Sequence, residues 1–161
     1  MTASVRPYAQ GDEGPLCPML NAIIAAGGTT AHETPFTPEA LAEYFLTGAQ
    51  ILFSHVVLEG GWPVGFQSVS RNPELPPGWG DMSSFTRRDP KVPGAGRALF
   101  AATRAAAQAR GLVALNATIR ADNVPGLAYY SAMGFVDYDV IPAVPLRDGT
   151  PVDRVMKRLI L

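Results

Sequence analysis

The chain has 161 residues, a net charge of −1, and a composition that is 47% hydrophobic and 17% charged. These values predict a folded domain with a real core rather than a disordered segment. The near-neutral charge argues against a nucleic-acid partner, and no apolar run approaches the length of a membrane-spanning helix. One cysteine and two histidines are too few for an internal disulfide or a zinc site built from Cys and His. We therefore expect a single cytoplasmic domain over residues 1–161, with no metal and no membrane association.

The first half of the chain predicts a strand, two helices and a hairpin. Residues 4–8 predict a short strand, and Asp12 can cap the amphipathic helix that follows it. A second helix begins after Thr37, a capping residue followed by proline, and Tyr44 is expected on its buried face. Residues 51–71 contain two runs of β-forming residues separated by two glycines, which is typical of a β-hairpin.

The second half alternates strands and helices. Residues 79–86 predict a fourth strand, residues 96–110 a helix, and residues 112–119 a buried strand. Asn123 is a plausible cap for the next helix, and two final strands are expected within residues 135–161. This order of elements predicts an α/β or α+β domain with a mixed sheet.

A glycine-bearing loop at residues 91–96 leads directly into the helix at 96–110. Glycine lets the backbone turn sharply, and the unpaired N–H groups of a helix start can hold an anion such as a phosphate. A P-loop would require Lys and then Ser or Thr after its second glycine, and a Rossmann turn would require a third glycine where Leu99 stands. The spacing of Lys91, Gly94 and Gly96 resembles the pyrophosphate loop of acyl-CoA N-acyltransferases. A glycine turn that only begins a helix is the alternative.

A second stretch extends this resemblance. Asn123, Gly126, Tyr130, Gly134 and Phe135 have the order and spacing of the second motif of the GNAT N-acetyltransferase superfamily. One helix and one strand separate the two motifs, as in that superfamily. Short segments near the first two helices and near the C-terminus resemble its phosphinothricin acetyltransferase-like branch.

The resemblance implies a single-domain GNAT fold. Its mixed sheet of about seven strands is splayed between the fourth and fifth strands and flanked by about four helices. It also implies acetyl-CoA as the acyl donor. Pro93 departs from the usual loop because it has no N–H to donate, and Lys91 and Arg97 either contact phosphate or are ordinary surface charges. The residues that the resemblance places on the donor are Phe85, Thr86, Lys91, Val92, Gly94, Ala95, Gly96, Arg97, Ala98, Asn123 and Tyr130.

Tyr130 matches the tyrosine with which the family protonates the departing CoA thiolate, a general-acid role. Packing is its alternative role. The neighbouring Tyr129 stands where the family usually has an aliphatic residue, so we expect it in the core.

A general base is also needed, because an amine is protonated at neutral pH and must lose a proton before it attacks. Asp81 on the fourth strand is one candidate, and Glu33, in the loop that lines the acceptor pocket of relatives, is another. His32 and His55 are further alternatives, and solvated surface charge is an alternative role for both acids.

These expectations predict direct transfer of an acetyl group from acetyl-CoA to the amine of a small molecule, such as an amino acid or an analogue. Two other functions stay open: a non-catalytic acyl-CoA sensor, and an acetyltransferase that modifies a protein N-terminus or lysine. Similar proteins are commonly homodimers, so a dimer is an expectation from the resemblance alone.

Overall fold

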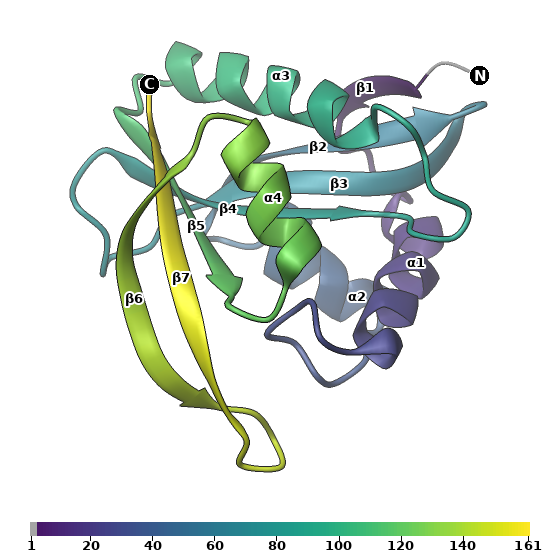
Figure 1. The fold of residues 1–161 in the computed structure, drawn as a ribbon. Helices are drawn as coiled ribbons and strands as arrows, with labels where there is room; N and C mark the ends of the chain where they lie inside the picture. The colour runs from purple at the N-terminus through teal and green to yellow at the C-terminus, as the bar shows by residue number, and fades with distance from the viewer. Residues whose placement is uncertain (1–2) are drawn as a thin grey trace.

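The computed structural model describes residues 3–161, which form one seven-stranded mixed sheet with the strand order β1-β2-β3-β4-β5-β7-β6 (Figure 1). The strands are β1 (Ala3–Pro7), β2 (Ile51–Glu59), β3 (Trp62–Ser70), β4 (Trp79–Thr86), β5 (Ala114–Arg120), β6 (Val136–Pro145) and β7 (Pro151–Ile160). The helices are α1 (Glu13–Ala26), α2 (Pro38–Leu41) with its π-helical continuation η1 (Ala42–Thr47), α3 (Ala95–Ala109) and α4 (Val124–Ala132).

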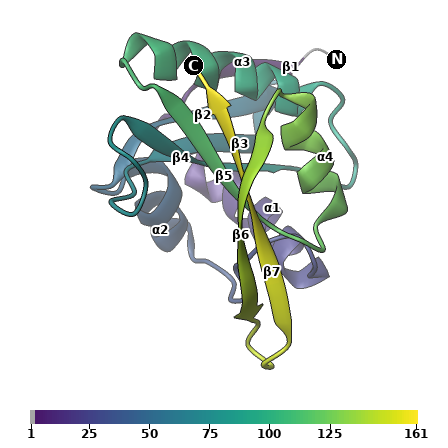
Figure 2. The ribbon, with the colours of Figure 1, turned by 60° about the vertical axis from the view of Figure 1, so that its left-hand side comes forward.

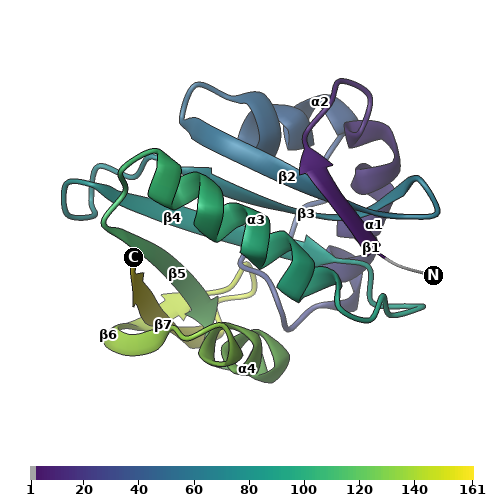
Figure 3. The ribbon, with the colours of Figure 1, turned by 90° about the horizontal axis from the view of Figure 1, so that it is seen from above.

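Helices cover both faces of the sheet. Seen from above, α3 and α4 lie on one side of the sheet and α1 and α2 on the other (Figure 3). α3 packs against β1, β2, β3 and β4. The long β6–β7 hairpin projects away from the body of the domain (Figure 2). None of the helices within residues 3–161 has the length and apolar character needed to cross a membrane.

The sheet opens between β4 and β5. The two strands run parallel, and they pair only where Trp79–Asp81 of β4 lies beside Ala114–Asn116 of β5. Beyond this point β4 stays with β3, while β5 pairs along its whole length with β7. The predicted splay between the fourth and fifth strands is therefore confirmed, and it leaves one edge of β4 without a strand partner beyond Asp81.

Each face of the sheet has its own apolar core. The core between the sheet and α1 and α2 includes Leu16, Leu20, Leu41, Phe45, Val56 and Phe66. The core between the sheet and α3 and α4 includes Val69, Phe100, Leu115, Ile119, Tyr130 and Phe135. The site described below lies where the second core ends at the opening of the sheet.

Two sequence expectations about the first two helices are wrong. Asp12 precedes α1 but does not cap it through its side chain, because Arg6 (2.7 and 2.9 Å) and the Ala9 N–H (2.8 Å) already hold its carboxylate. Tyr44 is 58% exposed rather than buried. The chain continues from α2 as a π-helix, whose wider turns rotate successive side chains away from the positions that α-helical spacing predicts.

Candidate functional site

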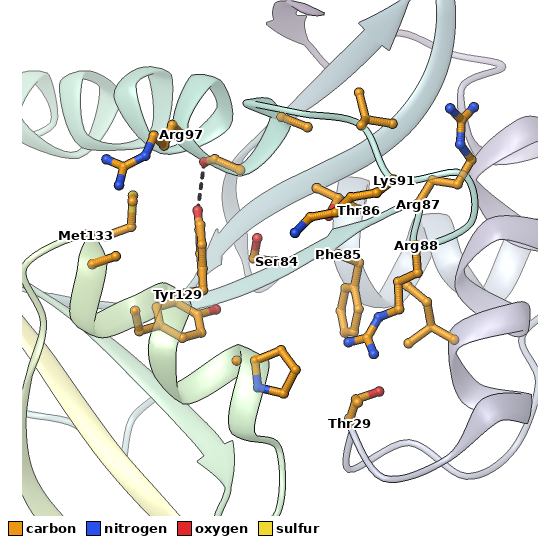
Figure 4. Close-up of a pocket in the computed structure, with 18 of the residues that line it drawn as sticks. Thr29, Ser84, Phe85, Thr86, Arg87, Arg88, Lys91, Arg97, Tyr129 and Met133 are labelled. Carbon is orange, nitrogen blue, oxygen red and sulfur yellow. Dashed lines mark hydrogen bonds between the residues drawn. The ribbon is translucent and has the colours of Figure 1, made fainter.

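A cavity of about 540 Å³ lies where β4 and β5 part (Figure 4). Its walls come from the end of β4, the loop before α3, the first turn of α3, one face of α4 and the α1–α2 loop. Lining residues from these elements include Thr29, Ser84, Phe85, Thr86, Arg87, Arg88, Lys91, Val92, Gly94, Ala95, Gly96, Arg97, Asn123, Gly126, Tyr129, Tyr130 and Met133. Ten of the eleven residues expected at the donor are in this set. Ala98 is not, and its N–H donates to the Gly94 carbonyl within the helix (3.0 Å).

The start of α3 presents unpaired N–H groups to this cavity. Gly94 adopts a φ of 76° at the N-cap, a left-handed conformation that glycine takes without steric cost. The Ala95 N–H bonds back to the Val92 carbonyl (3.2 Å), but those of Gly94, Gly96 and Arg97 have no acceptor within residues 3–161. Together with the helix dipole, these donors favour a negatively charged ligand.

The charges at the cavity have one sign. Arg87, Arg88, Lys91 and Arg97 line it, and no lining residue is acidic. Arg87 is paired with Glu59 (2.8 Å), whereas no other of these four cations forms an ion pair in the described part of the chain. Figure 4 shows Lys91 reaching toward the middle of the cavity, while Arg87 points away from it.

The free edge of β4 supplies further backbone donors. The Arg87 N–H bonds to the Val64 carbonyl (2.8 Å), so residues 87 and 64 form a hydrogen-bonded pair of the antiparallel β3–β4 ladder. Because such pairs alternate, the peptide groups of Ser84 and Thr86 face away from β3, toward the opening. The Thr86 N–H is therefore available to a ligand that lies along this edge.

Tyr130 lines the cavity although it is only 8% exposed. Its ring packs edge-on against Phe135 (5.2 Å between centroids). Its hydroxyl bonds to no described residue and is not among the fully buried polar atoms that lack a partner, so it is reached from the cavity. Burial, with smaller contributions from Tyr129 and Asp81, raises the pKa of Tyr130 well above its ordinary value, which keeps the phenol protonated.

Tyr129, expected to be an ordinary core residue, also lines the cavity with its hydroxyl in a polar network. The hydroxyl accepts from Gln67 (2.7 Å) and donates to the Gly96 carbonyl (2.8 Å, dashed in Figure 4). Burial raises the pKa of Tyr129 to about 12. The sequence contained one signal of this role, since a tyrosine replaces the aliphatic residue usual at this place in the motif.

Asn123 joins two elements of the cavity wall. Its side-chain oxygen caps α4 by accepting from the Gly126 N–H (3.0 Å), as predicted, and its amide donates to the Thr29 carbonyl (2.8 Å). The α1–α2 loop is thereby held against the start of α4.

The two acidic candidates lie away from this cavity. Asp81 lines a separate cavity of about 650 Å³, whose walls also include Ser83 on β4 and residues of α2 and η1. Its carboxylate accepts from Asn116 (2.9 Å) and Asn72 (3.1 Å). Glu33 is exposed, lines neither cavity, and accepts from the backbone N–H of Arg147 (2.7 Å) at the tip of the β6–β7 hairpin.

Neither histidine lies in the cavity between β4 and β5. The His32 ring packs edge-on against Tyr44 (5.0 Å) and Phe36 (5.3 Å). His55 lies within β2, where its Nδ1 is buried without a partner. Burial lowers the pKa of both side chains, which favours their neutral forms.

No family model matches the chain, and no curated protein matches it significantly in sequence. Solved structures are much more similar. The chain superposes on a ribosomal-protein-alanine N-acetyltransferase from Brucella melitensis with a TM-score of 0.84 at 20% identity, over 98% of this chain and 99% of that one. A GNAT superfamily phosphinothricin acetyltransferase from Sinorhizobium meliloti, in complex with AcCoA, gives 0.86 at 23% identity, over 100% and 89%. A GCN5-related N-acetyltransferase from Kribbella flavida gives 0.85 at 20% identity, over 99% and 98%.

Identities of 20–23% establish an architecture but not an activity. The seven-stranded mixed sheet, its opening between β4 and β5, and the flanking helices confirm the expected architecture. This chain has the GNAT fold.

Proposed function

We propose that the protein is an N-acetyltransferase that transfers an acetyl group from acetyl-CoA to the amine of a small molecule. The observation that carries this proposal is the cavity between β4 and β5, where the unpaired N–H groups of α3 and the cationic side chains of Arg88, Lys91 and Arg97 lie beside the free edge of β4. An anion site beside an extended edge fits a ligand that carries a diphosphate at one end of a flexible, amide-containing arm. One of the structurally similar enzymes holds AcCoA, which supports the same donor here.

Backbone and side-chain donors would share the diphosphate. The N–H groups of Gly94, Gly96 and Arg97 belong to residues that line the cavity and have no acceptor within residues 3–161, and Pro93 contributes none. Lys91 and the Arg97 guanidinium add charge-assisted hydrogen bonds. The apolar walls would exclude water, which strengthens each of these interactions.

Acetyl-CoA supplies an activated thioester, and the protein's own groups stabilise the charges that develop around it. The Thr86 N–H on the free edge of β4 can donate to the carbonyl oxygen as negative charge gathers there. Tyr130 can donate its proton toward the sulfur as the C–S bond breaks. Burial raises the pKa of the phenol, so Tyr130 keeps its proton until negative charge develops on the sulfur.

The incoming amine needs a proton acceptor, and we propose Asp81, which lines the neighbouring cavity and would receive the proton through water where the sheet opens. The carboxylate lies on the last residue of β4 that pairs with β5, where the opening begins. Asn72 and Asn116 fix its orientation through two hydrogen bonds. Glu33 is the other acidic candidate, and we propose that it holds the hairpin instead, which its hydrogen bond from the Arg147 N–H supports.

A small acceptor is favoured over a protein chain because the β6–β7 hairpin meets the α1–α2 loop. Arg147 donates its backbone N–H to Glu33 and its guanidinium to Thr34. These contacts bridge segments more than 100 residues apart, and on this proposal they would close one end of the acceptor side. A groove for an extended peptide would be open at both ends.

The proposal is tested with the unmodified protein in two steps. Calorimetric titration with coenzyme A should give saturable binding, and incubation with acetyl-CoA and a panel of small amines and peptides should release free thiol for at least one small amine. Absence of binding at millimolar coenzyme A would refute the donor. Binding without thiol release for any amine or N-terminal peptide would favour a non-catalytic acyl-CoA sensor. Release with peptides alone would favour a protein acetyltransferase.

A further inference from the structure

A chain of buried polar side chains runs beneath the cavity between β4 and β5. Gln67, in the middle of β3, and Thr103, on the inner face of α3, are both 0% exposed. Polar groups at such positions cost free energy unless they are hydrogen-bonded. Each of the two side chains is hydrogen-bonded, and the successive hydrogen bonds extend from the core to the start of α3.

The hydrogen bonds of this chain all run in one direction. The Thr103 hydroxyl donates to Oε1 of Gln67 (2.6 Å). That contact turns the Gln67 Nε2 toward the cavity, where it donates to Tyr129 (2.7 Å) and to Ser84 (3.0 Å). The Tyr129 hydroxyl in turn donates a hydrogen bond to the Gly96 carbonyl (2.8 Å). Thr103, Gln67 and Tyr129 thus form a line of hydrogen-bond donors that ends at one peptide group, and Ser84 is a side branch of that line.

That peptide group faces the anion site. A trans peptide is planar, with its C=O and N–H pointing in opposite directions. The carbonyl of Gly96 and the N–H of Arg97 belong to the same unit, and this N–H is one of those without an acceptor in residues 3–161. A hydrogen bond accepted by the carbonyl therefore fixes the direction of the N–H and, because hydrogen bonds in a chain polarise one another, makes it a stronger donor.

The glycine at position 96 is what allows Tyr129 to reach this carbonyl. A Cβ on Gly96 would lie 2.7 Å from Cε1 of the Tyr129 ring, closer than real contacts allow. A small residue here and a tyrosine at position 129 are therefore sterically matched.

We infer that Tyr129 is a positioning residue, which orients and polarises the Gly96–Arg97 peptide so that its N–H binds the diphosphate of the acyl donor. Tyr129 itself need not touch the phosphates. This inference rests on the proposed function, because it assigns a residue to the binding of the same donor.

The test compares three variants with the unmodified protein. Tyr129→Phe keeps the ring and removes only the hydroxyl. Thr103→Val interrupts the far end of the chain, at a residue that does not line the cavity. Tyr138→Phe is the matched control, because it also loses a phenol hydrogen bond, that to Asn116 (2.5 Å), but lies outside this cavity. Thermal unfolding confirms that each variant is folded, and coenzyme A affinity is measured by calorimetry.

We expect Tyr129→Phe to weaken coenzyme A binding by about tenfold, the effect of losing roughly one hydrogen bond. Thr103→Val should weaken it less, and Tyr138→Phe should leave it unchanged. A local readout accompanies the affinities. In ¹H–¹⁵N spectra, coenzyme A should shift the Arg97 amide proton downfield, and this shift should shrink in Tyr129→Phe more than in the control.

Two outcomes would overturn the inference. One is a folded Tyr129→Phe variant with unchanged affinity and an unchanged Arg97 amide shift, and the other is an equal loss of affinity in Tyr138→Phe. These outcomes differ from failure of the proposed function, in which the unmodified protein itself would not bind coenzyme A.

Discussion

Replacing Gly96 by alanine should destabilise the protein, against the usual effect of removing glycine from a helix. The added Cβ would lie 2.7 Å from Cε1 of Tyr129 and 3.3 Å from its Cζ. The ring cannot move aside freely, because its hydroxyl is held by Gln67 (2.7 Å) and by the Gly96 carbonyl (2.8 Å). Overpacking of this kind costs about 1–3 kcal/mol, and the higher helix propensity of alanine offsets about 0.5–1 kcal/mol. We expect a net loss of about 1–2 kcal/mol.

Gly14 provides a matched control. It is the second residue of α1, as Gly96 is of α3, and a Cβ there would meet nothing within 4 Å. Gly14→Ala should therefore be neutral or stabilising by up to about 1 kcal/mol. Urea unfolding monitored by circular dichroism gives both values from midpoints at a common slope.

A double-mutant cycle with Tyr129→Leu identifies the cause. Leucine lacks the ring atoms nearest the new Cβ, so Gly96→Ala should be harmless in that background. The coupling energy should be about 1–3 kcal/mol. If Gly96→Ala changes stability equally with tyrosine and with leucine at position 129, or if it behaves as Gly14→Ala does, the steric match between these positions is refuted.

Three further predictions concern catalysis and acid stability. Tyr130→Phe should lower kcat by about 100-fold with little change in coenzyme A affinity, and Tyr8→Phe serves as its control, because it loses a phenol hydrogen bond to Glu13 (2.7 Å) outside both cavities; equal kcat values in the two variants would contradict the acid role. Asp81→Asn should lower turnover at pH 7 by about 100-fold and restore part of it at alkaline pH, where more of the amine is already deprotonated; a pH–rate profile like that of the unmodified protein would exclude Asp81 as the base. Burial opposes ionisation of Asp12, but hydrogen bonds from Arg6 and from the backbone hold its pKa below the ordinary value of 3.8. This pair therefore stabilises the protein above that pH and ceases to do so as the pH falls through the lowered pKa. Arg6→Gln should move acid unfolding to higher pH, measured by circular dichroism between pH 2 and 7, and an unchanged midpoint would contradict the assignment.

Local patterns predicted most of the fold, because the interactions that define its elements are close in sequence. The Thr37 hydroxyl accepts from the Ala40 N–H (3.1 Å), and Asn123 caps α4 in the same way. Asp12 failed as a cap because Arg6, on the preceding strand, competes for its carboxylate. Capping preference describes what a side chain can do, and a nearby charge decides what it does.

The site was only partly predictable for a related reason. The glycine loop and Tyr130 belong to short patterns, and both contribute to one cavity. The link between Gln67 and Tyr129 joins residues 62 positions apart, and no spacing rule connects a strand residue to a helix residue at that distance. The sequence offers Asp81 and Glu33 as acids near the expected site, but residue type alone does not show which hydrogen bonds hold each of them, and these place the two in different surroundings.

The short contact between β4 and β5 divides the sheet into two halves. Only three residues of each strand, Trp79–Asp81 and Ala114–Asn116, join them. Any extended molecule that hydrogen-bonds to the exposed border of β4 while its other end is gripped at α3 would act as a substitute strand, fastening one half to the other. A bound ligand would then make the sheet continuous across its opening, so we expect the protein to become more rigid as the fraction of ligand-bound molecules increases.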